Sequence, residues 1–230
     1  MSSISVMIVD DQQIIRSGLA SMLSHHADIV VVGQAADGVE AVRLADEVRP
    51  DVVLMDIRMP NLDGIGATKA ITDAHDSTRV VILTTFADEE YLLDTVRAGA
   101  VGFLLKDAGP DLLAAAVRTA VRGETLIDPT MTRSLLEHRL EQRGDEVTPP
   151  AQHREHPLIA SLSERERDVL VAIGKGMSNA EIATALHVSD TTVKSHVSNV
   201  LLKTRTRSRL QAAVFAYESG FVRPEPWDAS

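Results

Sequence analysis

Five short apolar segments in the first half of the chain constrain its fold more than any other feature. Each is rich in Val, Ile and Leu without alternation of polar and apolar residues, which is typical of strands buried on both faces of a parallel sheet. Helical patterns separate them, so the sequence predicts an α/β, doubly wound domain of strand–helix repeats. The expected strands span residues 5–10, 29–35, 51–56, 80–85 and 102–106, and the helices 38–48, 64–75, 88–98 and 110–122, after a first helix around Leu19.

The second half of the chain predicts a different and smaller domain. Asp128 and Pro129 are typical of a helix N-cap followed by proline at the first helical position, and that helix is expected to end near Arg139. A polar, proline-containing stretch follows, as in a linker. From Leu158 onward the pattern is wholly helical. We therefore expect a first domain over 1–125, a linker helix and flexible linker over 126–157, and an all-α domain over 158–223.

Composition excludes several classes of protein. The chain contains no cysteine, so disulfides, thiol catalysis and cysteine-based zinc sites are absent. No apolar run of about 18 residues predicts a membrane span, and the N-terminal residues do not resemble a signal peptide, so we expect a cytoplasmic protein without membrane contact. Charge is uneven: residues 158–223 carry nine Lys and Arg against six Asp and Glu, whereas the preceding residues are strongly acidic. A modestly basic module is a candidate for contact with nucleic acid phosphates, although a solvated face also explains it.

Polar side chains end four of the five expected strands. They are Asp10 with Asp11, Asp56, Thr84 and Lys106. Any one of these alone is most often a cap, a turn residue or a solvated strand end. Because the carboxyl ends of parallel strands meet at one edge, however, these groups are expected to converge there. Clustered carboxylates need a compensating cation, and their hard oxygens favour Mg²⁺. A carboxylate beside Mg²⁺ can attack a phosphoryl group.

The all-α domain contains the pattern of a helix-turn-helix. Ser163 and Glu166 form a capping box before the first helix, which ends at Gly174 or Gly176. The second helix begins at Ser178 or Asn179, and a third begins within 190–192. The outward positions of the third helix carry polar or basic residues, which suit contact with phosphates and base edges. The spacing of the helices alone fits a DNA-binding domain and a solvated helix bundle equally well. These candidate residues are Thr192, Lys194, Ser195, Ser198, Asn199 and Lys203.

The first domain resembles the receiver of response regulators, which has a flavodoxin-like fold. The resemblance rests on Asp10-Asp11, Asp56 in LMDIRMPNLDG, Thr84, and GFLLKD, which contains Phe103 and Lys106. It implies that Asp56 is the phosphoacceptor, and that Lys106 contacts the phosphoryl group. It further implies that Asp10, Asp11 and Asp56 bind Mg²⁺ with the backbone carbonyl of Arg58.

The same resemblance implies a switch made of Thr84 and Phe103. A phosphoryl group adds roughly −1.5 to −2 charges and strong acceptor oxygens. Thr84 is expected to move toward those oxygens, and the ring of Phe103 to turn into the space that Thr84 leaves. The surface around the last strand of the sheet would then change.

The second domain resembles the LuxR-type helix-turn-helix, through LSERERDVL, GMSNAEIA and VSDTTVKSHV, so that the whole chain is similar to a NarL/FixJ-type response regulator. The resemblance implies that Lys194, Ser195 and Ser198 face DNA, that Glu164 is a structural anchor, and that a closing helix over 208–219 pairs two copies. Thr204 departs from the usual hydrophobic residue, so the stretch 204–209 is expected to contact phosphates rather than pack.

These patterns together predict a DNA-binding transcription factor rather than an enzyme. Its expected partners are a sensor histidine kinase, which phosphorylates Asp56, and promoter DNA, which a phosphorylation-induced homodimer binds. The alternative is an atypical response regulator that binds DNA without phosphorylation. An aspartyl phosphatase is disfavoured because Arg58 stands where such enzymes carry a second acid. A receiver that acts through protein contacts alone is disfavoured by the helix-turn-helix pattern.

Overall fold

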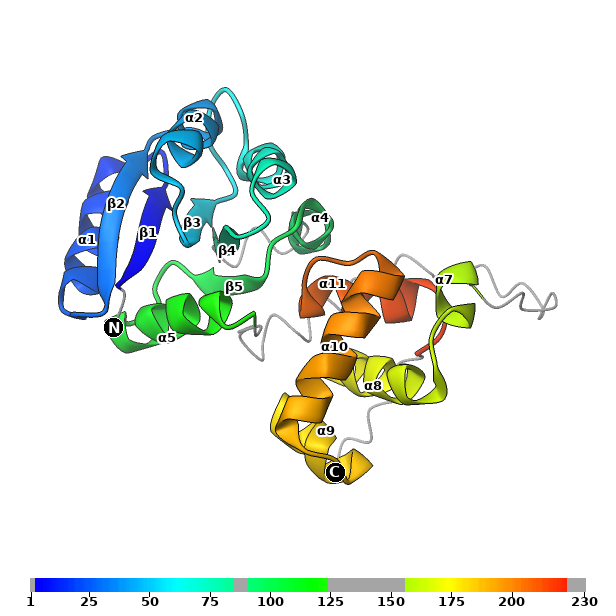
Figure 1. Ribbon diagram of the computed structural model, residues 1–230. Coiled ribbons are helices and arrows are strands. Elements are labelled where there is room, and N and C mark those ends of the chain that lie inside the picture. The colour runs from blue at the N-terminus through cyan, green and yellow to red at the C-terminus, as the bar shows by residue number, and fades with distance from the viewer. Residues whose placement is uncertain (1–2, 85–90, 124–155, 223–230) are drawn as a thin grey trace, which may run out of the picture. The chain divides into compact units, whose positions relative to one another are not determined.

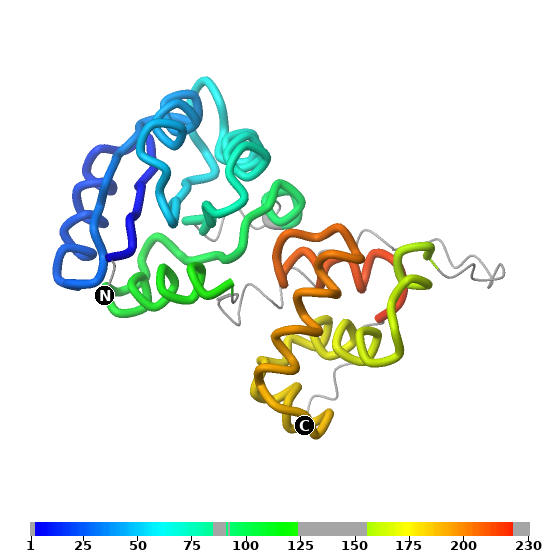
Figure 2. Tube along the Cα trace, viewed as in Figure 1, coloured from blue at the N-terminus to red at the C-terminus, as the bar shows by residue number. Residues whose placement is uncertain are grey.

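The computed structural model describes residues 3–84, 91–123 and 156–222. Contacts divide the chain into two compact units, Met1–His138 and Arg139–Ser230 (Figures 1 and 2). The expected linker helix, and all but the last two residues of the expected linker, lie outside the described residues, so the limits proposed for them stay predictions.

The first unit is a parallel sheet between two layers of helices. The strands are β1 (Ile4–Val9), β2 (Ile29–Ala35), β3 (Val52–Asp56), β4 (Arg79–Thr84) and β5 (Gly102–Leu105), in the order β2-β1-β3-β4-β5. Their helices are α1 (Gln13–Ser24), α2 (Gly38–Val48), α3 (Gly64–Ala74), α4 (Leu92–Ala98) and α5 (Pro110–Val121). Helices α1 and α5 cover one face, and α2, α3 and α4 cover the other (Figure 1). The predicted doubly wound α/β fold is confirmed.

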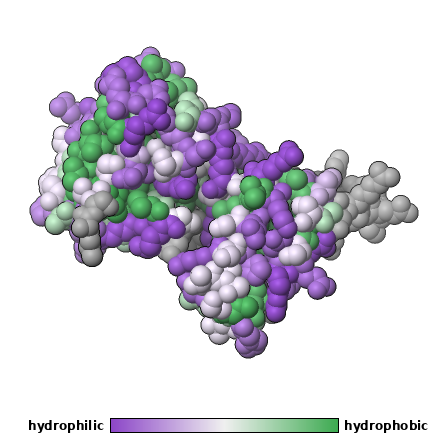
Figure 3. Space-filling model, in the orientation of Figure 1, coloured by the Kyte–Doolittle hydropathy of each residue, from purple (hydrophilic) through white to green (hydrophobic). Residues whose placement is uncertain are grey.

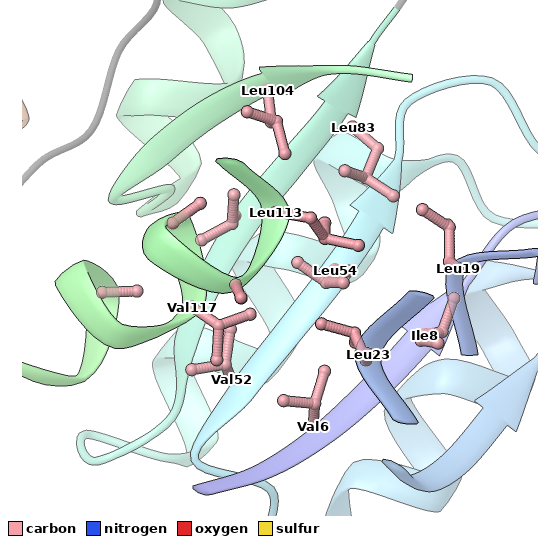
Figure 4. Packing of buried hydrophobic residues seen from close by; sticks show 14 of the residues in the cluster. Val6, Ile8, Leu19, Leu23, Val52, Leu54, Leu83, Leu104, Leu113 and Val117 are labelled. Carbon is pink, nitrogen blue, oxygen red and sulfur yellow. The ribbon is translucent and has the colours of Figure 1, made fainter. Parts of the chain in front are cut away.

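Burial on both faces explains why the central strands show no alternation. Every residue of β3 is buried, as are the last four residues of β1. Figure 4 shows leucines and valines of α1 and α5 pointing toward those of the central strands. The labelled members of this cluster are Val6, Ile8, Leu19, Leu23, Val52, Leu54, Leu83, Leu104, Leu113 and Val117.

Strand β2 differs from the expectation of complete burial. It lies at the edge of the sheet, its register on β1 shifts between Val6 and Met7, and Val30 and Val32 are exposed. A bulge on an edge strand twists it and discourages pairing with another chain. On the face drawn in Figure 3, hydrophobic residues form small groups among hydrophilic ones. No helix in the described part of the chain is long and apolar enough to cross a membrane.

The second unit is built from short, capped helices. They are α7 (Pro157–Ala160), α8 (Glu164–Gly174), α9 (Asn179–Leu186), α10 (Asp190–Thr204) and α11 (Arg209–Glu218). The capping box of Ser163 and Glu166 is confirmed at the start of α8, and Ser178 makes a second one at α9. Ser189 caps α10 by accepting a hydrogen bond from the Thr192 N–H. Such caps stabilise helix starts by about 1 kcal/mol each, which matters for helices this short.

Thr204 corrects one expectation about the second unit. It is only 3% exposed, and its hydroxyl donates to the Val200 carbonyl oxygen at 2.7 Å. A hydroxyl that bonds to the preceding turn of its own helix can be buried without a large desolvation penalty. The expectation that Thr204 contacts phosphates was therefore wrong: this threonine occupies the packing position itself.

Two buried threonines on α3 differ in whether the side-chain hydroxyl makes a hydrogen bond, so they can be compared directly. Thr68 is fully buried, and its hydroxyl has no hydrogen-bond partner among the described residues. Thr72, one turn later, donates to the Ala98 carbonyl oxygen at 2.7 Å. Valine has nearly the same shape as threonine, so we expect Thr68→Val to raise the free energy of unfolding by about 1 kcal/mol, because an unpaired hydroxyl is removed.

The control for that substitution is Thr72→Val, which should lower the free energy of unfolding by about 1 kcal/mol because a made hydrogen bond is lost. Urea unfolding followed by circular dichroism measures both. Equal effects of the two substitutions would contradict the assignment of Thr68 as an unpaired group.

The contact between Arg118 and Asp28 predicts an acid-dependent loss of stability. Arg118 on α5 donates to both carboxylate oxygens of Asp28, each at 2.7 Å. These hydrogen bonds lower the pKa of Asp28 from 3.8 to about 2. A folded pKa below the unfolded one stabilises the protein above about pH 4 and ceases to do so as the pH falls toward about 2. We expect Arg118→Ala to move the acid-unfolding midpoint, followed by circular dichroism, to higher pH. An unchanged midpoint would contradict this.

Candidate functional site

The carboxyl ends of four strands bring the candidate residues of the first unit together. Asp10 directly follows β1, Asp56 ends β3, Thr84 ends β4 and Lys106 directly follows β5. Asp10, Asp56 and Thr84 are each at most 3% exposed. Parallel pairing of β1 with β3, β3 with β4 and β4 with β5 fixes these ends beside one another. The convergence predicted from the strand ends is confirmed in its geometry.

Lys106 joins two of the three carboxylates. Its ammonium nitrogen lies 2.8 Å from Asp10 Oδ2 and 2.9 Å from Asp56 Oδ2. The Lys106 side chain is 15% exposed and both partners are almost completely buried. Buried like charges this close repel each other strongly unless a cation stands between them. One ammonium therefore compensates two buried acids, and the cluster as a whole remains negatively charged.

The pKa values express this imbalance. Burial raises the pKa of Asp56 above its ordinary value, although contact with Lys106 works in the opposite direction. Burial tends to lower the pKa of Lys106, but its contacts with Asp10 and Asp56 outweigh that effect and the pKa is raised. Lys106 is thus held as a cation, while burial works against the charged form of Asp56. Such a site favours a further cation.

The three aspartates form a candidate metal site. Ligand oxygens of Asp10, Asp11 and Asp56 lie within 4.8 Å of one another, and Asp11 is the exposed member. Carboxylate oxygens of this kind suit hard divalent cations that keep part of their water shell. Arg58, the expected source of a carbonyl ligand, lies in the loop after β3, and its guanidinium carbon is 5.5 Å from the centre of the Tyr91 ring. Its role as a ligand stays a prediction.

A glycine holds the loop after β3 against the candidate phosphoacceptor. The Gly64 N–H donates to the Ile57 carbonyl oxygen at 2.8 Å. A Cβ atom on Gly64 would stand 1.9 Å from the main-chain oxygen of Asp56, which cannot move because it belongs to a buried strand. The Ile57 N–H in turn donates to Asp56 Oδ1 at 2.8 Å. This loop therefore sets the orientation of the Asp56 carboxylate.

The expected switch residues are both completely buried. Thr84 and Phe103 have no exposed surface. The inward rotation expected for Phe103 would therefore begin from a ring that already lies inside the protein. A switch role for Thr84 and Phe103 stays a prediction.

Sequence reasoning missed Arg16, which supports the acidic cluster from outside. Arg16 lies on α1, and its Nη1 donates to the main-chain oxygen of Asp10 at 2.7 Å. An arginine on an amphipathic helix usually extends into solvent, so the sequence carries no signal that this one turns back to the preceding loop. Only the packing of α1 against the sheet reveals the contact.

The candidate DNA-binding residues lie along α10. Lys194, Ser195, Ser198 and Asn199 are exposed, and Thr192 is half-buried. The ammonium of Lys194 lies 2.9 Å from a carboxylate oxygen of Asp190, four residues earlier. Their side chains are more than half exposed, so the pair is screened by water and can open at little cost. The arrangement offers a row of polar groups along one helix, which is suited to a nucleic acid groove.

Lys203 has a structural partner that the sequence did not indicate. Its ammonium lies 2.6 Å from Glu166 Oε2, and the Glu166 side chain is 5% exposed. Burial tends to raise the pKa of Glu166, but hydrogen bonds from Lys203 and Ser163 reverse this and lower it. The pair ties the start of α8 to the end of α10. The expectation that Glu164 is the anchor was wrong, since Glu164 is exposed and Glu166 is the buried acid.

Known families match both units. The family model described as "Response regulator receiver domain" matches residues 6–118, and that of "Bacterial regulatory proteins, luxR family" matches residues 160–216. Uncharacterized transcriptional regulatory protein YxjL of Bacillus subtilis (strain 168) is 40% identical over 220 residues, which cover 96% of this chain and 98% of that protein. The chain belongs to the response regulators with a LuxR-type DNA-binding domain.

Other relatives agree with this assignment. Response regulator protein VraR of Staphylococcus aureus (strain COL) is 36% identical over 221 residues, covering 96% of this chain and all of that protein. Among solved structures, response regulator ChrA of a heme-sensing two-component system is 34% identical in sequence to this chain. The two structures match with a TM-score of 0.53, and the match covers 96% of this chain and 100% of ChrA. In the present chain, the acidic cluster lies within the residues matched by the receiver family, and α10 lies within those matched by the luxR family. The protein is therefore a transcriptional regulator.

The close approach at Gly64 generates a prediction for the receiver. Gly64→Ala should lower the free energy of unfolding by about 3 kcal/mol, because the added methyl group collides with a buried main-chain oxygen. Gly18→Ala is the matched control, since Gly18 is also helical and a Cβ there meets nothing within 4 Å. That control should raise stability by about 0.5–1 kcal/mol. Thermal unfolding of both variants measures the difference, and similar effects would contradict the proposed constraint.

Proposed function

We propose that this response regulator is switched by transfer of a phosphoryl group from a sensor histidine kinase to Asp56. A carboxylate oxygen of Asp56 would form the new bond to phosphorus while the bond from phosphorus to the kinase histidine breaks. The observation that carries the proposal is the position of Lys106, 2.9 Å from Asp56 Oδ2, within a cluster of three carboxylates. An ammonium in this place can bind the Asp56 carboxylate before transfer and stabilise the negative charge of the phosphoryl oxygens during and after it.

Mg²⁺ is the cofactor that the donor set supports. Asp10, Asp11 and Asp56 would hold it, together with the main-chain carbonyl of Arg58. When bound, the ion supplies positive charge that neutralises the transferred phosphoryl group. The chain itself positions the acceptor: the Ile57 N–H fixes Asp56 Oδ1, and Lys106 holds Asp56 Oδ2. Arg58 occupies the position at which an aspartyl phosphatase carries a second acid, which supports a role as a regulator rather than as an enzyme.

The proposed output is promoter binding by a phosphorylated homodimer. One helix-turn-helix covers only a half-site, so two copies on a two-fold-related site bind far more tightly than one. Thr192, Lys194, Ser195, Ser198 and Asn199 are the proposed contacts on α10. Lys203 is a weaker candidate, because a direct phosphate contact would compete with its ion pair to buried Glu166.

The test is the mass and oligomeric state of the full chain after treatment with acetyl phosphate and Mg²⁺, beside Asp56→Asn. We expect the wild type to gain the mass of one phosphoryl group and to shift from monomer toward dimer, and the variant to do neither. Chelation of Mg²⁺ should abolish labelling of the wild type. Light scattering coupled to size exclusion and intact-protein mass spectrometry measure both.

Two outcomes separate the parts of the proposal. Labelling that persists in Asp56→Asn, or its absence in the wild type, would overturn the assignment of Asp56 and favour a regulator that binds DNA without phosphorylation. Labelling without dimerisation would retain the acceptor chemistry and overturn the proposed output.

A further inference from the structure

Two hydrogen bonds hold the loop that carries Asp10 and Asp11. Helix α1 begins directly after it, yet the side chain of its N-cap residue Gln12 makes no capping hydrogen bond within the described part of the chain. The carboxylate of Asp10 instead stabilises the turn before the helix, since its Oδ1 accepts the Gln12 N–H at 2.8 Å. Arg16 completes the arrangement from the next turn of the helix by donating to the Asp10 main-chain oxygen. One aspartate is therefore held at both its main chain and its side chain.

This restraint opposes the electrostatics of the cluster. Asp10, Asp11 and Asp56 place carboxylate oxygens within 4.8 Å of one another, and the ion pairs of Lys106 are with Asp10 and Asp56 in the described part of the chain. Repulsion therefore pushes the loop away from β3 whenever no further cation is present. Asp10 is completely buried and Asp11 is exposed, so the loop is the part that can yield. A donor that holds the carbonyl between these two side chains resists that movement directly.

We propose that Arg16 is a positioning residue for divalent-cation binding: by holding the Asp10 carbonyl, it keeps the carboxylates of Asp10 and Asp11 directed toward Asp56. The inference rests on the proposed function, because it assumes that the acidic cluster binds a cation. Arg16 itself contacts neither the cation nor the phosphoryl group. It acts as the partners behind metal ligands generally do, by reducing the rearrangement that binding requires.

The sign of the effect distinguishes this role from simple electrostatics. A guanidinium near a dication repels it, so charge alone predicts that removing Arg16 tightens cation binding. Loss of the restraint predicts the opposite. Because the Arg16 side chain is partly exposed, water screens its charge, whereas the hydrogen bond acts on Asp10 itself. We therefore expect the restraint to be the larger effect and binding to weaken.

The test is titration of the full chain with Mn²⁺, as a probe for the site, followed by calorimetry. Arg16→Ala should weaken Mn²⁺ binding about tenfold, in the range found for partners behind metal ligands. Arg16→Lys should bind with intermediate affinity, because one donor is retained. Arg43→Ala is the matched control: Arg43 is an exposed helical arginine of the same unit whose partner is Glu47, and its removal should leave Mn²⁺ affinity unchanged.

A second measurement separates positioning from damage to the acceptor. The rate of labelling by acetyl phosphate in Arg16→Ala should recover at saturating Mg²⁺, so that only the Mg²⁺ concentration giving half the maximal rate changes. Tighter Mn²⁺ binding, or unchanged binding with a lowered melting temperature, would overturn the inference. If Arg16→Ala does not fold, an unaltered affinity in Arg16→Lys would overturn it equally. Absence of Mn²⁺ binding in the wild type would instead overturn the proposed metal site, and this inference with it.

Discussion

The contact of Lys106 with Asp10 and Asp56 is the interaction on which the acidic end of the receiver depends. Two buried carboxylates at the ends of neighbouring strands would repel each other without an ammonium between them. Lys106 reaches them because it directly follows β5, at the same edge of the sheet. The order of the strands thus brings the compensating lysine to the same edge as the acids. One ammonium does not neutralise three carboxylates, so a bound cation or phosphoryl group would change the charge balance of this site.

An ion pair between Lys203 and buried Glu166 connects two helices of the LuxR-type domain. Glu166 caps α8 through Ser163 and accepts the ammonium of Lys203 from the end of α10. The same pair holds the end of α10, the helix that carries the candidate DNA contacts, against the start of α8. Thr204, beside Lys203, closes the helix with a buried and satisfied hydroxyl. The end of α10 therefore takes part in packing, whereas the candidate DNA contacts in its middle are exposed.

Sequence reasoning succeeded where one physical pattern dominates. Apolar runs without alternation identified the strands, and the polar residues at strand ends identified the edge of the sheet where the acidic cluster lies. It failed where a single side chain has two plausible environments. Glu164 and Glu166 both stand in the first turn of α8, and only packing decides that Glu166 is buried. Val30 and Val32 have the composition of a central strand, yet β2 lies at the edge and leaves them exposed.

The sequence by itself determined the doubly wound fold of the receiver, the capped helices of the second domain and the identity of the acidic cluster, because these follow from local periodicity, capping and the rule that parallel strands end together. Only the tertiary structure decided which partner each charge takes. Arg16 turns back to the Asp10 carbonyl, and Lys203 turns inward to Glu166. The tertiary structure also decided that the ring of Phe103 is completely buried. Long side chains reach several neighbours at similar energy, so their partners depend on how the helices and strands that carry them pack together.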